Sequence, residues 1–207
     1  MIPLDQVRKI LKPYGYSAEI VTMEHYPLFE NDLDDGDRYE LGRTRYQDWR
    51  KALEATFSSE GTKFLVTADL HEGALILGVT PFPGNIGRMW MLQSKSFVVE
   101  ASKTHGRGLP HKMGAATRAM LDLFLCHYPV LFNFIPRSQA RNIRWLQQGG
   151  FQFFHRTDID TDIVFFGQGE GVEGLAANAA LWDSCLGIEL TKPQPNSTEE
   201  ILATTAR

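Results

Sequence analysis

Three apolar segments of the sequence, 63–69, 74–80 and 88–94, follow one another with only short turns between them. Apolar runs of this length that are bounded by Gly or Pro are typical of β-strands. Three strands joined by such short turns favour an antiparallel meander. The centre of the chain is therefore predicted to be antiparallel sheet.

A longer connection follows this meander. Residues 95–110 are polar and contain glycine, so they are predicted to be a loop, and residues 110–127 have the apolar spacing of a helix. The run 130–135 is apolar except for Asn133, which is typical of a central strand that is buried on both faces. Strand 88–94, the helix and strand 130–135 are then a parallel crossover unit.

The remaining elements complete an α+β chain, because antiparallel strands alternate with helices. Residues 1–16 are predicted to be an N-terminal extension, 17–167 a compact domain and 168–207 a partly flexible C-terminal appendage with one short helix at 176–186. The other predicted elements are strands at 17–23, 151–155 and 163–166 and helices at about 24–32, 44–58 and 138–148.

Composition excludes several classes of protein. With 43% hydrophobic residues among 207, the chain is not disordered as a whole, and its net charge of −4 argues against a dedicated nucleic-acid binder. Only Cys126 and Cys185 are present, which excludes a disulfide scaffold, and no ligand spacing predicts a metal site. The polar N-terminus and the lack of an apolar stretch of about 18 residues predict a soluble, cytoplasmic protein without a membrane partner.

Two segments together resemble the GNAT acyltransferase family. Lys-Thr-His-Gly-Arg-Gly at 103–108 stands where that family has Gln/Arg-x-x-Gly-x-Gly/Ala, and residues 139–151 end in the Gly-Phe of its Asn-x-x-Ala-x-x-x-Tyr-x-x-x-Gly-Phe segment. The order of the elements is also similar over about 17–167. The resemblance implies a GNAT-like α+β fold: a mixed, mostly antiparallel central sheet flanked by helices, with a splayed parallel strand pair.

The resemblance also implies acetyl-CoA as co-substrate. Glycines let backbone N–H groups converge on a pyrophosphate beside a helix N-terminus, and basic side chains add charge-assisted bonds. The pantetheine arm would pair with exposed strand backbone, where an N–H polarises the thioester carbonyl. Alternatively, the glycines only shape a loop, and Asn142 is a surface helix residue. The predicted cofactor-binding residues are Met91, Leu92, Gln93, Lys103, Gly106, Arg107, Gly108 and Asn142.

In such a reaction an acceptor amine attacks the thioester directly, and a base removes its proton. The predicted catalytic residues are Glu40, His105 and Asn133. Glu40 has a simple alternative as a solvated surface residue. An unpaired Asn133 amide would cost about 1–3 kcal/mol, so it either bonds to neighbouring backbone or lines the cleft. Leu146 stands where the family often has the Tyr that protonates the leaving thiolate.

Two functions are compatible with these features. The first is transfer of an acetyl group from acetyl-CoA to an amine of unknown identity. The second is a catalytically inactive bacteriophage virion or assembly protein, because Trp145-Leu146 looks like the GNAT-like proteins of short-tailed bacteriophages. Its partners would be phage structural proteins that contact residues 168–207. A nucleic-acid module is supported only by the row Arg137, Arg141 and Arg144, for which a solvated face is the commoner explanation.

Overall fold

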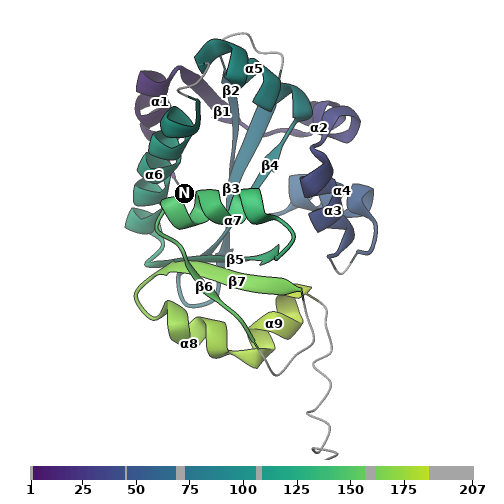
Figure 1. Cartoon of the computed structure of the whole chain (residues 1–207), viewed down its shortest axis with the longest axis vertical. Coiled ribbons are helices and arrows are strands. Elements are labelled where there is room, and N and C mark those ends of the chain that lie inside the picture. The colour runs from purple at the N-terminus through teal and green to yellow at the C-terminus, as the bar shows by residue number, and fades with distance from the viewer. Residues whose placement is uncertain (1, 45, 69–72, 106–108, 157–161, 187–207) are drawn as a thin grey trace, which may run out of the picture.

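The computed structural model describes residues 2–44, 46–68, 73–105, 109–156 and 162–186, and within them the strands form one seven-stranded sheet. The spatial order is β1-β2-β3-β4-β5-β7-β6, and every neighbouring pair is antiparallel except β4 and β5 (Figure 1). This confirms the predicted α+β class. The strands are β1 (Tyr16–Ile20), β2 (Thr62–Ala68), β3 (Ala74–Phe82), β4 (Ile86–Gln93), β5 (Val130–Pro136), β6 (Gln152–Phe154) and β7 (Ile163–Gly169).

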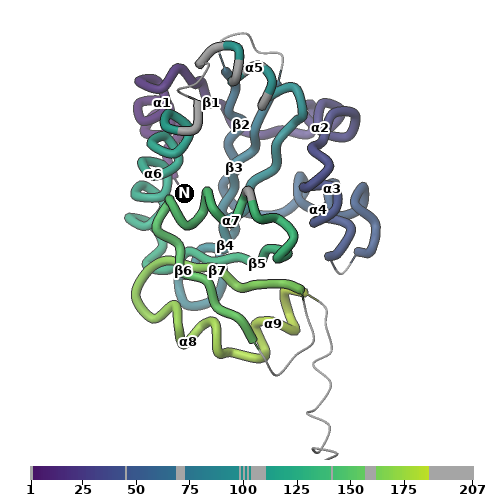
Figure 2. The backbone as a smooth tube through the Cα atoms, in the orientation of Figure 1, coloured from purple at the N-terminus to yellow at the C-terminus, as the bar shows by residue number. Residues whose placement is uncertain are grey.

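Helices cover both faces of the sheet (Figure 1, Figure 2). One core cluster packs α1 and α6 against β1–β5, and a second packs α2 and α4 against the opposite side chains of β2 and β3. A third cluster joins β5 and β7 to α8 and α9. The helices are α1 (Leu4–Leu11), α2 (Tyr26–Asp32), α3 (Asp35–Gly42), α4 (Trp49–Ser58), α5 (Lys95–His105), α6 (Leu109–His127), α7 (Ala140–Gln148), α8 (Val172–Ala177) and α9 (Ala179–Leu186), with 3-10 turns at Lys12–Tyr14 and Met23–His25.

The parallel pair β4 and β5 separates after its first residues. In the described part of the chain the two strands share three register positions, the last being Arg88 opposite Phe132. Beyond this point β4 stays paired with β3, and β5 stays paired with β7. The two strands therefore enclose a V-shaped space, called here the strand gap, between 89–93 of β4 and 133–136 of β5. The splayed parallel pair and the parallel crossover are both confirmed.

Two sequence predictions for connecting segments are wrong. Residues 95–105 form the helix α5 and not a loop, because Phe97 and Ala101 are spaced by one turn and are 1% and 0% exposed. The predicted helix at 176–186 is two helices, α8 and α9, which are separated at Asn178, a residue with extended backbone. The polar composition of 95–110 concealed the first of these, because buried positions such as Phe97 and Ala101 do not stand out in it.

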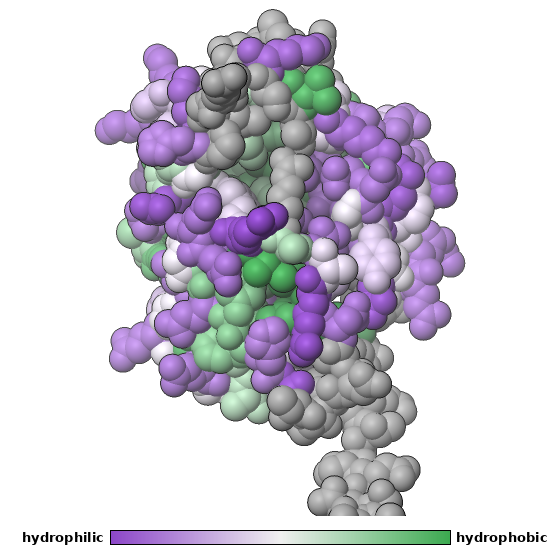
Figure 3. Space-filling view, viewed as in Figure 1, coloured by the Kyte–Doolittle hydropathy of each residue, from purple (hydrophilic) through white to green (hydrophobic). Residues whose placement is uncertain are grey.

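Both ends of the described chain pack onto the sheet. Val7 and Leu11 of α1 are buried in the first core cluster, and β7 extends to Gly169, after which Trp182 of α9 is fully buried. Figure 3 shows that polar side chains cover much of one face, while apolar ones reach the surface mainly in its lower half. The division of the chain at residues 16 and 167 stays a prediction.

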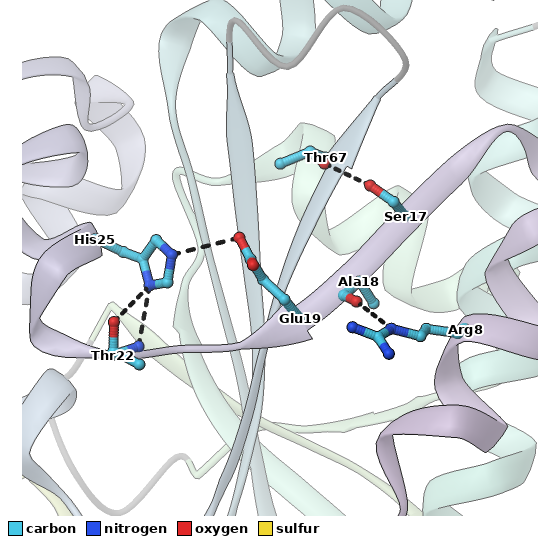
Figure 4. Close-up of polar contacts among 7 residues, drawn as sticks. All are labelled: Arg8, Ser17, Ala18, Glu19, Thr22, His25 and Thr67. Atoms are coloured by element: carbon cyan, nitrogen blue, oxygen red, sulfur yellow. Dashed lines mark hydrogen bonds and ion pairs between the residues drawn. The ribbon is translucent and has the colours of Figure 1, made fainter.

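The edge strand β1 is held by side chains from α1 and from the turn that follows β1 (Figure 4). Arg8 Nε donates to the carbonyl oxygen of Ala18 at 2.9 Å, which occupies a group on the outer edge of the sheet. His25 lies 3.4 Å from Glu19, and its Nδ1 accepts the backbone N–H of Thr22 at 3.0 Å. Because the His25 Nδ1 already accepts a backbone N–H of this turn, the Thr22 hydroxyl, the His25 imidazole and the Glu19 carboxylate together form a structural cap.

Candidate active site between the splayed strands

A cleft of about 390 Å³ follows the strand gap. Its lining comes from β4, β5, α3, α4 and α7 and from the last residues of α9. A volume of this size lies within the range of small-molecule sites, about 300–1,000 Å³. The residues that line it and enter the argument below are Asp37, Glu40, Arg43, Tyr46, Arg88, Trp90, Met91, Leu92, Asn133, Asn142, Trp145 and Leu146.

The structure brings together five of the predicted site residues around this cleft, which are Glu40, Met91, Leu92, Asn133 and Asn142. Lys103 is an exposed residue of α5 outside the cleft lining, and His105 is the last residue of the same helix. Gly106, Arg107 and Gly108 lie outside the described residues. The predicted pyrophosphate segment is therefore placed only by its neighbours, between the end of α5 and the start of α6 at Leu109.

The helix α3 crosses the open end of the strand gap. At its N-terminal end, Asp37 Oδ2 accepts the backbone N–H of Gln93 at 2.6 Å, and the Asp34 N–H donates to the Gln93 carbonyl at 2.9 Å. At its C-terminal end, Arg43 forms an ion pair with Asp162 at 2.5 Å. The Asp162 carbonyl accepts the N–H of Arg137, which directly follows β5. One short helix is thus fastened to both sides of the gap.

This helix begins in the acidic run 32–37, which the sequence analysis did not identify as part of a site. The Asp34 side chain accepts the Gly36 N–H at 2.9 Å as an N-cap, and Asp35 and Asp37 stand in the first turn, where carboxylates are favoured. Asp37 is 3% exposed and is buried beside β4. The sequence signal that could have located it is Asp34, because Asp is favoured as the N-cap residue just before a helix.

Glu40 lies one turn after Asp37 and also lines the cleft. Its Oε1 atom is enclosed and has no hydrogen-bond partner among the described residues. Burial, together with the negative charges of Asp37 and Asp34, raises the pKa of Glu40 to about 8. Burial also raises the pKa of Asp37 to about 7, against the opposing effect of the Gln93 hydrogen bond. Both carboxyl groups therefore exchange protons near neutral pH, as a general base must.

Arg88 and Asn133 join the two strands at the vertex of the gap. Arg88 Nε donates to Asn133 Oδ1 at 3.0 Å, and both side chains line the cleft. The amide oxygen of Asn133 is therefore satisfied by a side chain from β4. Of the two alternatives for this residue, the structure supports a place in the cleft wall.

The backbone of β4 has an open edge at Met91. The Ser94 N–H donates to the Ala74 carbonyl, and in an antiparallel pair every second residue bonds to the neighbouring strand. Residues 92 and 90 therefore bond to β3, whereas Met91 and Gln93 present their backbone groups to the other side. The backbone N–H and carbonyl of Gln93 are hydrogen-bonded to Asp37 and Asp34 at the start of α3. No described strand pairs with Met91 on that side, since the pairing of β4 with β5 ends at Arg88. An extended, amide-bearing chain has one complete backbone site to pair with there.

Two aromatic residues of the cleft were also missed. Trp145 of α7 lines the cleft, and its indole Nε1 is enclosed without a hydrogen-bond partner among the described residues. The helix predicted at about 44–58 begins only at Trp49, so Tyr46 precedes α4, is 39% exposed and lines the cleft. Helical spacing indicates a shared face, but it does not show where a helix begins.

Neither a membrane-spanning helix nor a metal-binding cluster is found in the part of the chain that the structure describes. None of its helices is long and apolar enough to cross a membrane. In these same residues, no group of three or more His, Cys, Asp or Glu side chains could hold a metal ion.

Several solved structures with the same architecture are acetyltransferases. The spermidine N-acetyltransferase from Vibrio cholerae, solved with CoA and spermine, is 9% identical, with a TM-score of 0.50 over 74% of this chain and 95% of its own. AAC(6')-Ib, solved with ribostamycin and coenzyme A, is 14% identical, with a TM-score of 0.50 over 80% and 99%. A scan against protein-family models and a search of curated proteins find no match. At these identities the similarity shows the fold, which is that of GNAT acetyltransferases.

Proposed function

We propose that this protein, with its GNAT fold, transfers an acetyl group from acetyl-CoA to the amine of a small molecule bound in the strand gap. The observation that carries the proposal is the position of Glu40. This carboxyl group, with a pKa of about 8, lines the same cleft as the unpaired β4 backbone at Met91. A proton acceptor and a backbone site for an extended thioester thus share one cavity.

The residues of the gap fit the pantetheine arm of acetyl-CoA. The Met91 N–H and carbonyl would pair with its amide groups, and the Met91 N–H lies on the edge from which a thioester oxygen can be polarised. Bound acetyl-CoA supplies a thioester carbon at which the amine nitrogen replaces sulfur. Asn142 of α7 lines the same cleft and would donate to the same arm.

Glu40 acts as the base in this proposal. An amine that enters as an ammonium ion must lose a proton before it attacks, and a carboxyl group with a pKa near the working pH accepts one efficiently. Asp37 adds a second buried carboxyl to the same wall, which favours a cationic acceptor. Leu146 provides no proton for the leaving sulfur, so the thiolate of CoA would take its proton from water.

The nucleotide end of acetyl-CoA would lie at the junction of α5 and α6. We propose Lys103, Gly106, Arg107 and Gly108 as the residues that hold the pyrophosphate, with His105 beside them. The 19-residue helix α6 begins immediately after this segment, which would add the positive end of its dipole. Substitution of Gly108→Glu should fill and repel this site and weaken acetyl-CoA binding.

The test combines binding and transfer. A thermal-shift titration measures acetyl-CoA binding, since ligand at 100 times its Kd stabilises a fold by about 2.7 kcal/mol. Release of free CoA thiol is then followed with a panel of primary amines. Glu40→Gln should keep acetyl-CoA binding and lower kcat about 10²–10⁴-fold. The matched control is Glu54→Gln, an exposed carboxyl group on α4.

Two results would contradict the proposal. Full activity of Glu40→Gln would exclude this residue as the base. The lack of any thermal shift at millimolar acetyl-CoA would exclude the cofactor and favour the alternative of an inactive bacteriophage virion protein. That alternative stays a prediction.

A further inference from the structure

The ion pair between Arg43 and Asp162 connects the two sides of the cleft. The two residues are 119 positions apart in the sequence, and Arg43 Nη2 lies 2.5 Å from Asp162 Oδ1. The other side of the guanidinium is also fixed, because Arg43 Nη1 donates to the Tyr39 hydroxyl at 3.0 Å. Arg43 thus has one defined position at the end of α3.

Asp162 is itself fixed to the wall formed by β5. Its carbonyl oxygen accepts the Arg137 N–H at 2.7 Å, and it directly precedes Ile163, the first residue of β7, which pairs with Pro136. A displacement of Asp162 would therefore require a displacement of the β5–β7 pair. The ion pair ties the C-terminal end of α3 to the start of β7.

Glu40 lies midway between the two attachments of α3. Asp37, Glu40 and Arg43 follow at intervals of three residues, a spacing that places neighbours on one helix face, and all three line the cleft. Asp37 is bonded to Gln93 of β4, and Arg43 to Asp162 beside β5. Release of either end would let the helix carry Glu40 away from the gap.

We propose that the Arg43–Asp162 ion pair is a positioning device that holds Glu40 at the open end of the strand gap. The inference rests on the proposed function. Arg43 and Asp162 act through α3 and are not catalytic residues. Their side chains are 42% and 40% exposed, and ion pairs this exposed contribute little to folding stability. Catalysis is far more sensitive, because a misplacement of about 1 Å can cost about 10²-fold in rate.

The experiment exchanges the two charges. Arg43→Asp and Asp162→Arg are each expected to lower kcat about 10–100-fold, with the KM for acetyl-CoA and the Tm nearly unchanged. The double variant, which restores an ion pair of opposite direction, should recover most of kcat. Arg43→Lys keeps the charge but loses the two-sided guanidinium contact, so an intermediate rate is expected. The control is Arg50→Gln, which breaks the exposed Arg50–Glu30 pair on α4 and α2.

The possible results separate the two proposals. Single variants with the rate of the unmodified protein, or a double variant no better than the singles, would overturn the positioning role while leaving acetyl transfer intact. A parallel loss of Tm and of acetyl-CoA binding in the single variants would also overturn it, because the pair would then support the fold in general. If the unmodified protein neither binds acetyl-CoA nor acetylates any amine, the proposed function fails and the positioning role fails with it.

Discussion

The buried carboxyl of Asp37 should make the stability of this protein depend strongly on pH. Burial raises its pKa from 3.8 to about 7. A raised pKa means that the folded chain holds the proton more tightly than the unfolded chain. The stabilisation by this proton is therefore complete below about pH 4 and is lost as the pH rises through 7. Three pKa units correspond to about 4 kcal/mol.

The variant Asp37→Asn removes the charge but keeps an oxygen that can accept the Gln93 N–H. Its new amide N–H groups lack an assured partner, which costs about 1–3 kcal/mol. We therefore expect a net stabilisation of about 1–3 kcal/mol at pH 8. Between pH 4.5 and pH 8, the difference in unfolding free energy between variant and parent should change by about 3 kcal/mol.

Urea denaturation at four pH values from 4.5 to 8, followed by tryptophan fluorescence, measures both free energies. The pair is also compared in the Glu40→Gln background, because the charge of Asp37 raises the pKa of Glu40 and the two titrations are coupled. Asp37→Ala is the matched variant that loses the acceptor as well. The difference in unfolding free energy between Asp37→Asn and the parent is the decisive quantity. If it is the same at pH 4.5 and pH 8, the assignment of a buried, destabilising charge is refuted.

Three further predictions concern the framework around the cleft. Lys63 Nζ donates to carbonyl oxygens at the C-terminal end of α4, so Lys63→Met should lower the unfolding free energy by about 1–3 kcal/mol, with Lys51→Met as the exposed control. A Cβ at Gly78 would lie 2.3 Å from the Trp90 ring, and Gly78→Ala should cost about 1–3 kcal/mol and disturb the cleft wall, seen as a shift in tryptophan emission. Trp182→Phe loses the bond from Nε1 to the Ala176 carbonyl and should cost about 1–2 kcal/mol in chemical denaturation; an unchanged midpoint would show that the bond is not needed.

The strands were predictable because their signals are local. Apolar runs with turn residues at their ends located the central strands to within about two residues, and the Gly149-Gly150 pair marked the end of α7, where Gly150 has a φ of 94°. The helix α5 was missed because segment 95–105 is largely polar, and among its side chains that the structure describes only Phe97 and Ala101 are buried. Whether such a segment forms a helix depends on the distant parts of the chain that bury its side chains.

The candidate site was predictable only in part, for the same reason. Glu40 and Asn133 were chosen by their place in the element order, and both line the cleft. Asp37 was not identified, because no local pattern shows that its carboxylate accepts the backbone N–H of Gln93, 56 positions later. Ion pairs and caps between distant segments, such as Arg43 with Asp162, depend on topology that a single sequence does not display.

The short seam between β4 and β5 has a consequence for the motions of the molecule. Three register positions connect a four-stranded half-sheet, β1–β4, to a three-stranded half, β5–β7. Such a narrow connection is where a native chain is expected to open without unfolding globally, so amides at the vertex should exchange with solvent sooner than those in the middle of β3 or β7. A thioester chain bound along the gap would bridge the two halves as an additional strand. Its binding should therefore slow amide exchange on both sides of the seam.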